Sequence, residues 1–414
     1  MQSGQRERAG GEAGRVLTTV LAVVAVLVLG ALVIGLVFGP ELVARGANGV
    51  LHPPPYPVRP EAREIHDKLF VADLHADPLL WSRDLLQRGT FGHVDVPRLI
   101  EANVALQVFG VVTQVPYGIN YERNASDAFD TITALTVLQR WPVATWTSRT
   151  ERAIYEAQKL ADVAARSGGR FRIIRSVEDL YAYARDRATN RQQTAGVLAI
   201  EGMQAIDGDL ANIARLRAAG FRMMGIAHFF DNQVGASVHG TSQGGLTELG
   251  RAAVRAMLSS NIAIDLAHAS PQVFQEVAAM TSKPLVVSHG GVKGTCDNVR
   301  NLSDAQIRLV AATGGVIGIG YWDHAVCDPS VEGIVKAIRY AVSVAGTDHV
   351  GLGSDFDGAT TTPFDTTGIP QITDGLLQSG LAPADIGKIM GVNVFRVLRN
   401  NLPSGVEPTP AATP

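Results

Sequence analysis

The sequence predicts an α/β protein, a (β/α)8 TIM-type barrel preceded by one N-terminal transmembrane helix. The chain of 414 residues is 46% apolar and 18% charged, so it can bury the core of one large domain. Short apolar runs alternate with amphipathic helical segments, an order typical of a parallel sheet wrapped by helices. Residue types that bind metals end several of these runs, which predicts a site at the C-terminal face of the barrel.

The longest apolar run lies near the N-terminus. Residues 16–38 form 23 uncharged, almost wholly apolar positions, enough at about 1.5 Å per residue to cross a ~30 Å hydrocarbon layer. Cleavable signal peptides have apolar regions of only about 7 to 15 residues, and no small-x-small site follows, so we expect an uncleaved anchor. Arg6, Arg8 and Arg15 precede the run. The positive-inside rule therefore places residues 1–15 in the cytoplasm and the domain after the run in the periplasm or outside the cell, as in a single-pass membrane protein.

Two segments flank the predicted domain, which covers residues 61–402. Residues 39–60 contain five prolines from Pro53 onward and are expected to form a stiff, extended linker. Residues 403–414 are rich in Pro, Thr and Ala and are expected to be a disordered tail. The net charge of −3 and the scattered basic residues predict no nucleic-acid partner.

Eight apolar runs account for the strands of a closed barrel. A ninth run, residues 171–174, is placed outside the barrel because a helix-like segment follows it before the next run. The eight barrel strands are expected at residues 69–74, 103–112, 195–201, 221–228, 262–268, 284–289, 315–321 and 349–355.

Five side chains at the ends of these strands form a set suited to two metal ions. His75 and Asp77 end the first strand, Glu201 the third, His268 the fifth and His289 the sixth. Imidazole and carboxylate groups are ligands for borderline and hard divalent ions, and one carboxylate can bridge two ions about 3.5 to 4 Å apart. A single histidine at a strand end would more simply be a hydrogen-bonded, half-buried residue. The set as a whole predicts a binuclear metal site.

Two further residues lie at the same edge of the predicted barrel. His228 ends the fourth strand and Asp355 the eighth. With them, several motifs resemble those of the membrane dipeptidase family, peptidase family M19, within the amidohydrolase-like barrels. The resemblance extends from about Glu64 to Leu398. It is carried by DLHAD at 73, IEG at 200, GIAH at 225, GLTELG at 245, IDLAHAS at 264, VVSHGG at 286, RNLSD at 300 and GLGSDFDG at 351.

The resemblance implies a zinc-dependent dipeptidase with a metal-bridging hydroxide. It assigns one Zn²⁺ to His75, Asp77 and Glu201, and a second to Glu201, His268 and His289. The substrates that it implies are dipeptides, including those with a C-terminal D-residue. Family members are often dimers, so a homodimer is a further expectation.

The resemblance also assigns roles around the metals. Asp355 would take the proton of the attacking hydroxide and pass it to the leaving amine. His228 would hold the substrate carbonyl and its developing negative charge. Arg300 would grip the terminal carboxylate of the substrate, and Asn232, which follows the GIAH motif, would be a further substrate contact. Taken alone, Arg300 would more simply be a solvated loop residue, and only the RNLSD match reverses this.

The chain departs from the family pattern at one motif. Ala76 stands where the family commonly has Asn, and Pro78 follows Asp77. Two other interpretations stay open: a hydrolase of lactones, β-lactams or other amides on the same site, and a membrane-anchored binding protein without activity. The intact ligand set and Asp355 argue against the second, and Arg300 favours a substrate with a free carboxylate over a neutral lactone.

The two cysteines lie in loops after the sixth and seventh strands, at Cys296 and Cys327. Neighbouring loops at one face of a barrel can meet, and disulfides persist in oxidising compartments. We therefore expect a disulfide between them, with two unpaired thiols as the alternative. Their spacing does not suit a metal site.

Overall fold

Eight parallel strands form a closed ring. In this computed structural model the order around the ring is β3, β2, β10, β9, β8, β7, β6 and β5, and pairing of β3 with β5 closes it. The fold is therefore the predicted TIM barrel. The strands are β2 (Val71–Ala76), β3 (Val104–Phe109), β5 (Thr194–Ile200), β6 (Phe221–Gly225), β7 (Ala263–Asp265), β8 (Val286–Val287), β9 (Val316–Ile319) and β10 (Val350–Leu352).

The ninth apolar run lies outside the ring, as predicted. It forms β4 (Phe171–Ile173), which pairs with the first residues of β5. The next strand, β6, pairs with the second half of β5, from Leu198 to Ile200. Because β6 begins beside Leu198, the start of β5 has an edge free for β4.

The structure describes residues 3–405, with side chains from residue 17 onward except those of residues 31 and 32. The arginine side chains used to orient the membrane span, and residues 406–414 of the expected tail, lie outside this part.

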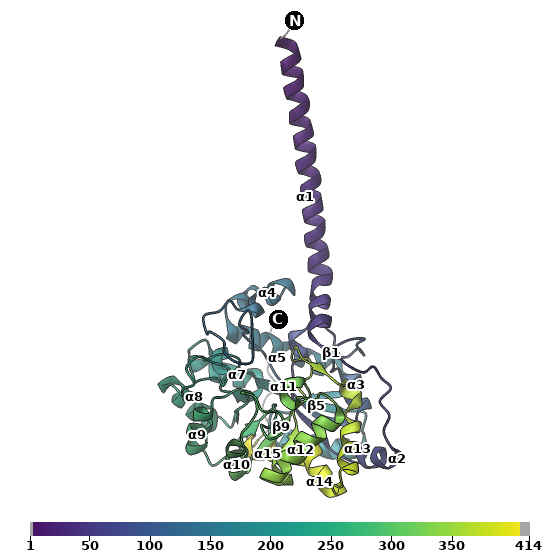
Figure 1. Ribbon diagram of the computed structural model, residues 1–414, viewed down its shortest axis with the longest axis vertical. Coiled ribbons are helices and arrows are strands. Elements are labelled where there is room, and N and C mark those ends of the chain that lie inside the picture. The colour runs from purple at the N-terminus through teal and green to yellow at the C-terminus, as the bar shows by residue number, and fades with distance from the viewer. Residues whose placement is uncertain (1–2, 406–414) are drawn as a thin grey trace.

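Helices surround the barrel (Figure 1). Serine or threonine caps begin several of them, and each cap side chain accepts a hydrogen bond from a backbone N–H of the first turn, which satisfies a donor that the helix leaves free. The helices of the domain are α2 (Pro60–His66), α3 (Val96–Glu101), α4 (Thr131–Leu138), α5 (Arg149–Arg166), α6 (Val177–Thr189), α7 (Ala211–Ala219), α8 (Glu248–Ser259), α9 (Pro271–Met280), α10 (Asp304–Ala312), α11 (Asp323–Val326), α12 (Val331–Ala345), α13 (Pro370–Gln378), α14 (Pro383–Gly387) and α15 (Asn393–Asn401).

The barrel wall has apolar side chains on both faces. Along β5, Val197 and Ala199 belong to one buried cluster, whereas Leu198 and Ile200 belong to another, because successive side chains of a strand point to opposite faces. The first cluster joins strands all around the ring and includes Val394 and Val397 of α15. We interpret it as the barrel interior, closed at the end opposite the strand C-termini. The second cluster packs the wall against the surrounding helices.

The first helix, α1 (Ser3–Ala47), extends away from the domain as a single rod (Figure 1). From Leu17 to Ala47 it is long and apolar enough to cross a membrane, a property that anchors and signal sequences share. It continues past the predicted end of the span, through Pro40.

The predicted linker differs from expectation because part of it is held by the domain. After α1, β1 (Gly49–Val50) pairs in parallel with β11 (Thr361–Thr362). Further along, the Arg59 guanidinium lies 2.6 Å from a carboxylate oxygen of Asp374. Residues 39–60 are therefore partly helical and partly docked, rather than a free spacer.

Candidate metal centre and active site

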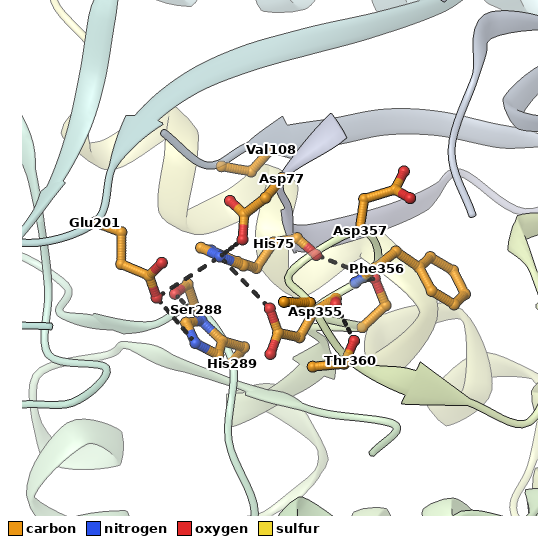
Figure 2. A network of polar contacts seen from close by, with 12 residues as sticks. His75, Asp77, Val108, Glu201, Ser288, His289, Asp355, Phe356, Asp357 and Thr360 are labelled. Carbon is orange, nitrogen blue, oxygen red and sulfur yellow. Dashed lines mark hydrogen bonds and ion pairs between the residues drawn. The ribbon is translucent and has the colours of Figure 1, made fainter. Parts of the chain in front are cut away.

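The C-terminal ends of the barrel strands bring predicted site residues together, and Figure 2 shows five of them: His75, Asp77, Glu201, His289 and Asp355. The backbone around His75 is tied to the segment after β10: Asp355 donates its N–H to the His75 carbonyl at 3.2 Å, and Asp77 donates to the Phe356 carbonyl at 2.8 Å. Glu201 donates its N–H to the Val111 carbonyl at 3.0 Å. The carboxylates of Asp77, Glu201 and Asp355 thus meet around the His75 ring.

One group of possible metal ligands lies on one side of Glu201. Its Oε1 is 3.0 Å from Nε2 of His268 and 3.2 Å from Nε2 of His289, and the two imidazole nitrogens are 3.0 Å apart. Ligands that surround a tetrahedral zinc at about 2.0 to 2.2 Å lie roughly 3.3 Å from one another. The three atoms therefore have the spacing of ligands around a shared cation.

A second group approaches the same carboxylate oxygen of Glu201. Nε2 of His75 is 3.3 Å from Asp77 Oδ2 and 3.8 Å from Glu201 Oε1, and these three residues are close enough to hold one ion. Glu201 is common to both groups. A carboxylate shared in this way can bridge two adjacent ions.

His228 and Asp355 also approach the ligand groups. Nε2 of His228 lies 3.2 Å from Glu201 Oε2, and Asp355 Oδ1 lies 3.9 Å from Nε2 of His75. By distance alone, Glu201, His228 and His268 could hold an ion, as could His75, His289 and Asp355. Geometry therefore brings all seven strand-end residues to one centre without by itself dividing ligands from non-ligands.

The His289 ring is oriented by two residues that sequence reasoning did not single out. The Ser288 hydroxyl donates to Asp265 Oδ2 at 2.5 Å and lies 2.9 Å from Nδ1 of His289. Such contacts hold a metal-binding imidazole in one orientation and one tautomer. The sequence does contain a signal for these two residues, because Asp265 stands three residues before His268 and Ser288 directly before His289. Their pairing is a contact between strands.

The electrostatics of the centre favour cations. Burial raises the pKa of Glu201 well above its ordinary value and that of Asp355 to about 8. Burial, together with the charge of Arg300, lowers the pKa of His268 well below its ordinary value. Neutral imidazoles are the form that binds metal. Buried carboxylates that lack a counterion take up protons instead, so this donor set fits divalent cations.

The centre opens into a cavity of about 210 Å³. One wall consists of the polar residues described above. Apolar and aromatic side chains complete the lining, among them Leu80, Val112, Tyr121 and Trp322. The Tyr121 ring stacks on His324, with 3.7 Å between ring centroids. A small apolar cavity with convergent polar groups is typical of a site for a small ligand.

Comparison with known proteins decides the family. The family described as "Membrane dipeptidase (Peptidase family M19)" matches residues 59–404. The chain belongs to this family. It is accordingly a metallo-dipeptidase, a hydrolase that depends on a metal cofactor.

Individual relatives have low sequence identity to this chain. A protein of the pqqA 5' region of Klebsiella pneumoniae is 31% identical over 58% of this chain and 93% of its own length. The dipeptidase tcpJ of Claviceps purpurea is 28% identical over 74% of this chain and 69% of its own. Among solved structures, a Rhodobacter sphaeroides metallopeptidase is 24% identical, with a TM-score of 0.67 and coverage of 80% of this chain and 99% of that one. At that identity the likeness shows the shared fold.

Arg300 of this M19 dipeptidase lines the cavity and is buried. Its Nη2 donates to the His289 carbonyl at 2.9 Å, and the guanidinium lies over the Trp322 ring at 5.9 Å from the centroid. Its buried Nε has no hydrogen-bond partner among residues 3–405. A buried donor without a partner costs free energy, so this group is suited to an anionic ligand.

Asn232, a predicted substrate contact, lies in the loop after β6. It is absent from the cavity lining. Its Nδ2 donates to the Ile226 carbonyl at 2.8 Å, and its Oδ1 accepts from the N–H groups of Val234 and Gly235 at 2.8 and 3.1 Å. The side chain is thus used to shape the loop after β6, and contact of Asn232 with substrate stays a prediction.

Cys296 and Cys327 are joined by a disulfide, with 5.3 Å between their Cα atoms. The bond lies between the loops after β8 and β9. Beside it, Asn298 and Asn301 donate to the His324 carbonyl at 2.8 and 3.0 Å. These contacts steady the segment that carries Arg300.

Proposed function

We propose that this protein is a zinc-dependent dipeptidase that hydrolyses the peptide bond of dipeptides with a free C-terminal carboxylate. The observation that carries the proposal is the position of Glu201. Its Oε1 lies within 3.0 to 3.8 Å of imidazole nitrogens of His268, His289 and His75, so one carboxylate can serve two ions.

The proposed division of ligands follows the family resemblance and is compatible with these distances. His75, Asp77 and Glu201 would hold one zinc ion, and Glu201, His268 and His289 the other. Zinc suits a set of imidazole nitrogens and carboxylate oxygens without thiolates. When bound, the two ions would polarise the scissile carbonyl and lower the pKa of a water molecule toward neutrality.

The remaining polar residues handle protons and charge. Asp355 faces the cavity beside His75 and would accept the proton of the attacking water, then donate it to the leaving amine. His228 would donate from Nε2 to the developing oxyanion. Burial lowers the pKa of His228 to about 4, so the ring carries one proton. Nδ1 lies 3.3 Å from the Gln114 carbonyl, which can only accept, so donation from Nε2 requires the ring to give up that contact and carry its proton on Nε2.

Substrate selection would rest on Arg300. Its unpartnered Nε and its guanidinium plane can make charge-assisted bonds to a carboxylate. The Rhodobacter sphaeroides neighbour was solved with a phosphinate mimic of the dipeptide L-Ala-D-Ala. We extend this to substrates of the present chain that carry a C-terminal D-residue.

The proposed location is the outer surface of a membrane. α1 would stay uncleaved, with its N-terminus in the cytoplasm and the barrel in the periplasm or outside the cell. A homodimer remains a prediction, which the mass of the purified protein in detergent would test.

The test is metal content together with hydrolysis of a dipeptide panel. The panel includes matched C-terminal amides, and each substrate is measured before and after chelation. Two zinc ions per chain, chelator-sensitive cleavage and rejection of the amides are the expected result. Zinc without dipeptide cleavage would redirect the assignment to lactones or other amides, and a chain that binds no metal would contradict it.

A further inference from the structure

Exposed apolar side chains gather on the loop and helix that follow β3. We call this surface the α4 face; its residues are Tyr117, Ile119, Phe129, Val137, Val143 and Trp146. Val143 and Tyr117 are 70% and 74% exposed. Isolated exposed apolar residues need no explanation, but a contiguous group marks a surface that meets an apolar partner.

The sequence of this region is unusually poor in charge for a surface. Residues 131–148 contain one charged residue, Arg140. They cover all of α4 and the turn after it, and 14 of these 18 residues are not buried. Apolar side chains, a tryptophan and a basic residue are the composition of segments that lie in the interface of a bilayer.

α1 leaves the domain beside the α4 face. In Figure 1 the rod emerges next to α4, at the side of the domain opposite α14 and α15. The two helices touch at Gly39, where an added Cβ would lie 3.2 Å from Cδ1 of Leu138. Gly39 directly follows the predicted span, residues 16–38. α4 therefore lies at the depth at which the apolar span ends.

The end of α1 is held firmly in this position. Ala44 is buried in a cluster with Trp81, Ile132 and Trp141. Arg45 lies 4.3 Å from the centroid of the Phe91 ring and donates to Thr90 Oγ1 at 3.2 Å. These contacts set the direction of the span relative to the barrel, so the bilayer would face the same side of the domain at all times.

The active-site cavity opens on this side. Leu80 and Val112 belong to the cluster that holds Ala44 and also line the cavity. Ile119 belongs to the α4 face, is 43% exposed and lines the cavity as well. The apolar cluster that holds Ala44 thus reaches the wall of the cavity, and Ile119 joins the α4 face to the same lining.

We infer that the α4 face rests on the bilayer that α1 crosses, so that substrates reach the metal centre at the membrane surface. This inference rests on the proposed membrane anchoring by α1. The occupant is lipid rather than a second copy of the chain, because the face adjoins the end of the span.

Lipid-borne quenching of a fluorophore tests the inference in the full chain. Val137, Val143 and Val392 are each replaced by cysteine, labelled, and placed in nanodiscs that hold one chain and lipids spin-labelled near the headgroup. Val392 is the matched control: it is a valine, is 50% exposed, and lies beside the start of β2 at the opposite end of the barrel. The unsubstituted chain corrects for labelling of the native cysteines.

We expect at least threefold stronger quenching at residues 137 and 143 than at 392. Two positions of the α4 face are used so that one poorly folding variant does not decide the outcome. Equal quenching at all three positions, in chains retained by the nanodisc, would overturn the inference while leaving the anchor intact. A chain that does not enter nanodiscs at all would overturn both.

Discussion

Asp355 combines a strained backbone conformation with a close contact to a glycine. Its φ is +59°, in the left-handed region that non-glycine residues rarely adopt. A Cβ at Gly358 would lie 2.0 Å from Asp355 Oδ1, so only glycine leaves space for the carboxylate in this position. Strain of this kind is kept where the surroundings require it, often at active sites.

We expect Asp355→Asn to keep both metals yet lose most turnover. The amide cannot accept the proton, and loss of general acid–base catalysis lowers kcat by about 10²- to 10⁴-fold. Metal per chain and kcat are measured together. Glu201→Gln is the comparison variant and should lose metal as well as activity. Turnover retained in Asp355→Asn would contradict the proton-shuttle role.

Arg300→Lys should separate recognition of the carboxylate from catalysis in general. Lysine keeps the charge but not the planar fork, and breaking a buried charge pair costs about 2–5 kcal/mol. We therefore expect kcat/KM for dipeptides to fall roughly 30-fold or more, with little change in the slow cleavage of their C-terminal amides. Arg185→Lys, at an exposed position on α6, is the control. An equal loss on both substrate types would argue against carboxylate binding.

At the scale of elements, the loops after the strands are held by contacts distant in sequence. The disulfide joins loops separated by 31 residues. The segment before α2 is held by β11, 312 positions further along the chain. Both devices stabilise the face of the barrel that carries the metal centre.

Because of the disulfide, we expect the native, unreduced protein to be inert toward thiol reagents. Neither cysteine should be labelled, and the double variant Cys296→Ser with Cys327→Ser should unfold more easily by about 3 to 4 kcal/mol, from the entropy of closing such a loop. Labelling is counted by mass and stability by denaturant unfolding. Labelling of both sulfurs would contradict the prediction.

Because this segment is docked, we predict that the stability of the isolated domain depends on the residue at which it begins. A chain beginning at residue 48 keeps the bond from Ala359 N–H to Asn48 Oδ1 at 3.0 Å and that from Leu51 N–H to the Thr362 carbonyl at 2.9 Å. A chain beginning at residue 59 loses them, and each hydrogen bond contributes about 0.5–1.5 kcal/mol. We expect a lower melting temperature for the shorter chain. Identical melting curves would show that residues 48–58 act as a free linker.

At the scale of the whole molecule, metal binding and folding stability are coupled. A carboxyl group whose pKa is raised in the folded state binds protons more tightly there than in the unfolded chain, so stability falls as pH rises toward the raised pKa. Glu201 and Asp355, the latter with a pKa of about 8, act in this direction. Buried histidines with lowered pKa values, such as His228, act oppositely, but only below about pH 6.5.

We therefore expect the chelated protein to lose stability between about pH 6.5 and 8. The slope should be about 1.4 kcal/mol per pH unit for each proton involved. Saturating zinc should flatten this slope, because cations then take the place of the protons. Denaturant unfolding across this range, with chelator and with zinc, measures both slopes. Equal slopes would show that the metals do not bind at these carboxylates.

Local patterns in the sequence determined much of this protein. Apolar runs of strand length located all eight barrel strands, because burial on both faces of a parallel strand leaves a continuous apolar run. The helix-like segment after the ninth run placed β4 outside the ring. The ligand candidates were visible because active barrel residues stand where such runs end. The observed strands are shorter than the predicted ones, as at β7 and β8. After β7 the chain leaves strand geometry, since His268 has a φ of +61°.

Only the tertiary structure decided the features that depend on contacts between distant segments. These include the Ser288–Asp265 pair that orients His289, the use of Asn232 within its own loop, the docking of residues 44–60, and the exit of α1 beside the cavity. None of them leaves a local periodicity, because each depends on which loops the closed barrel brings side by side. Residue types at strand ends are a local property, whereas their partners are set by the topology of the ring.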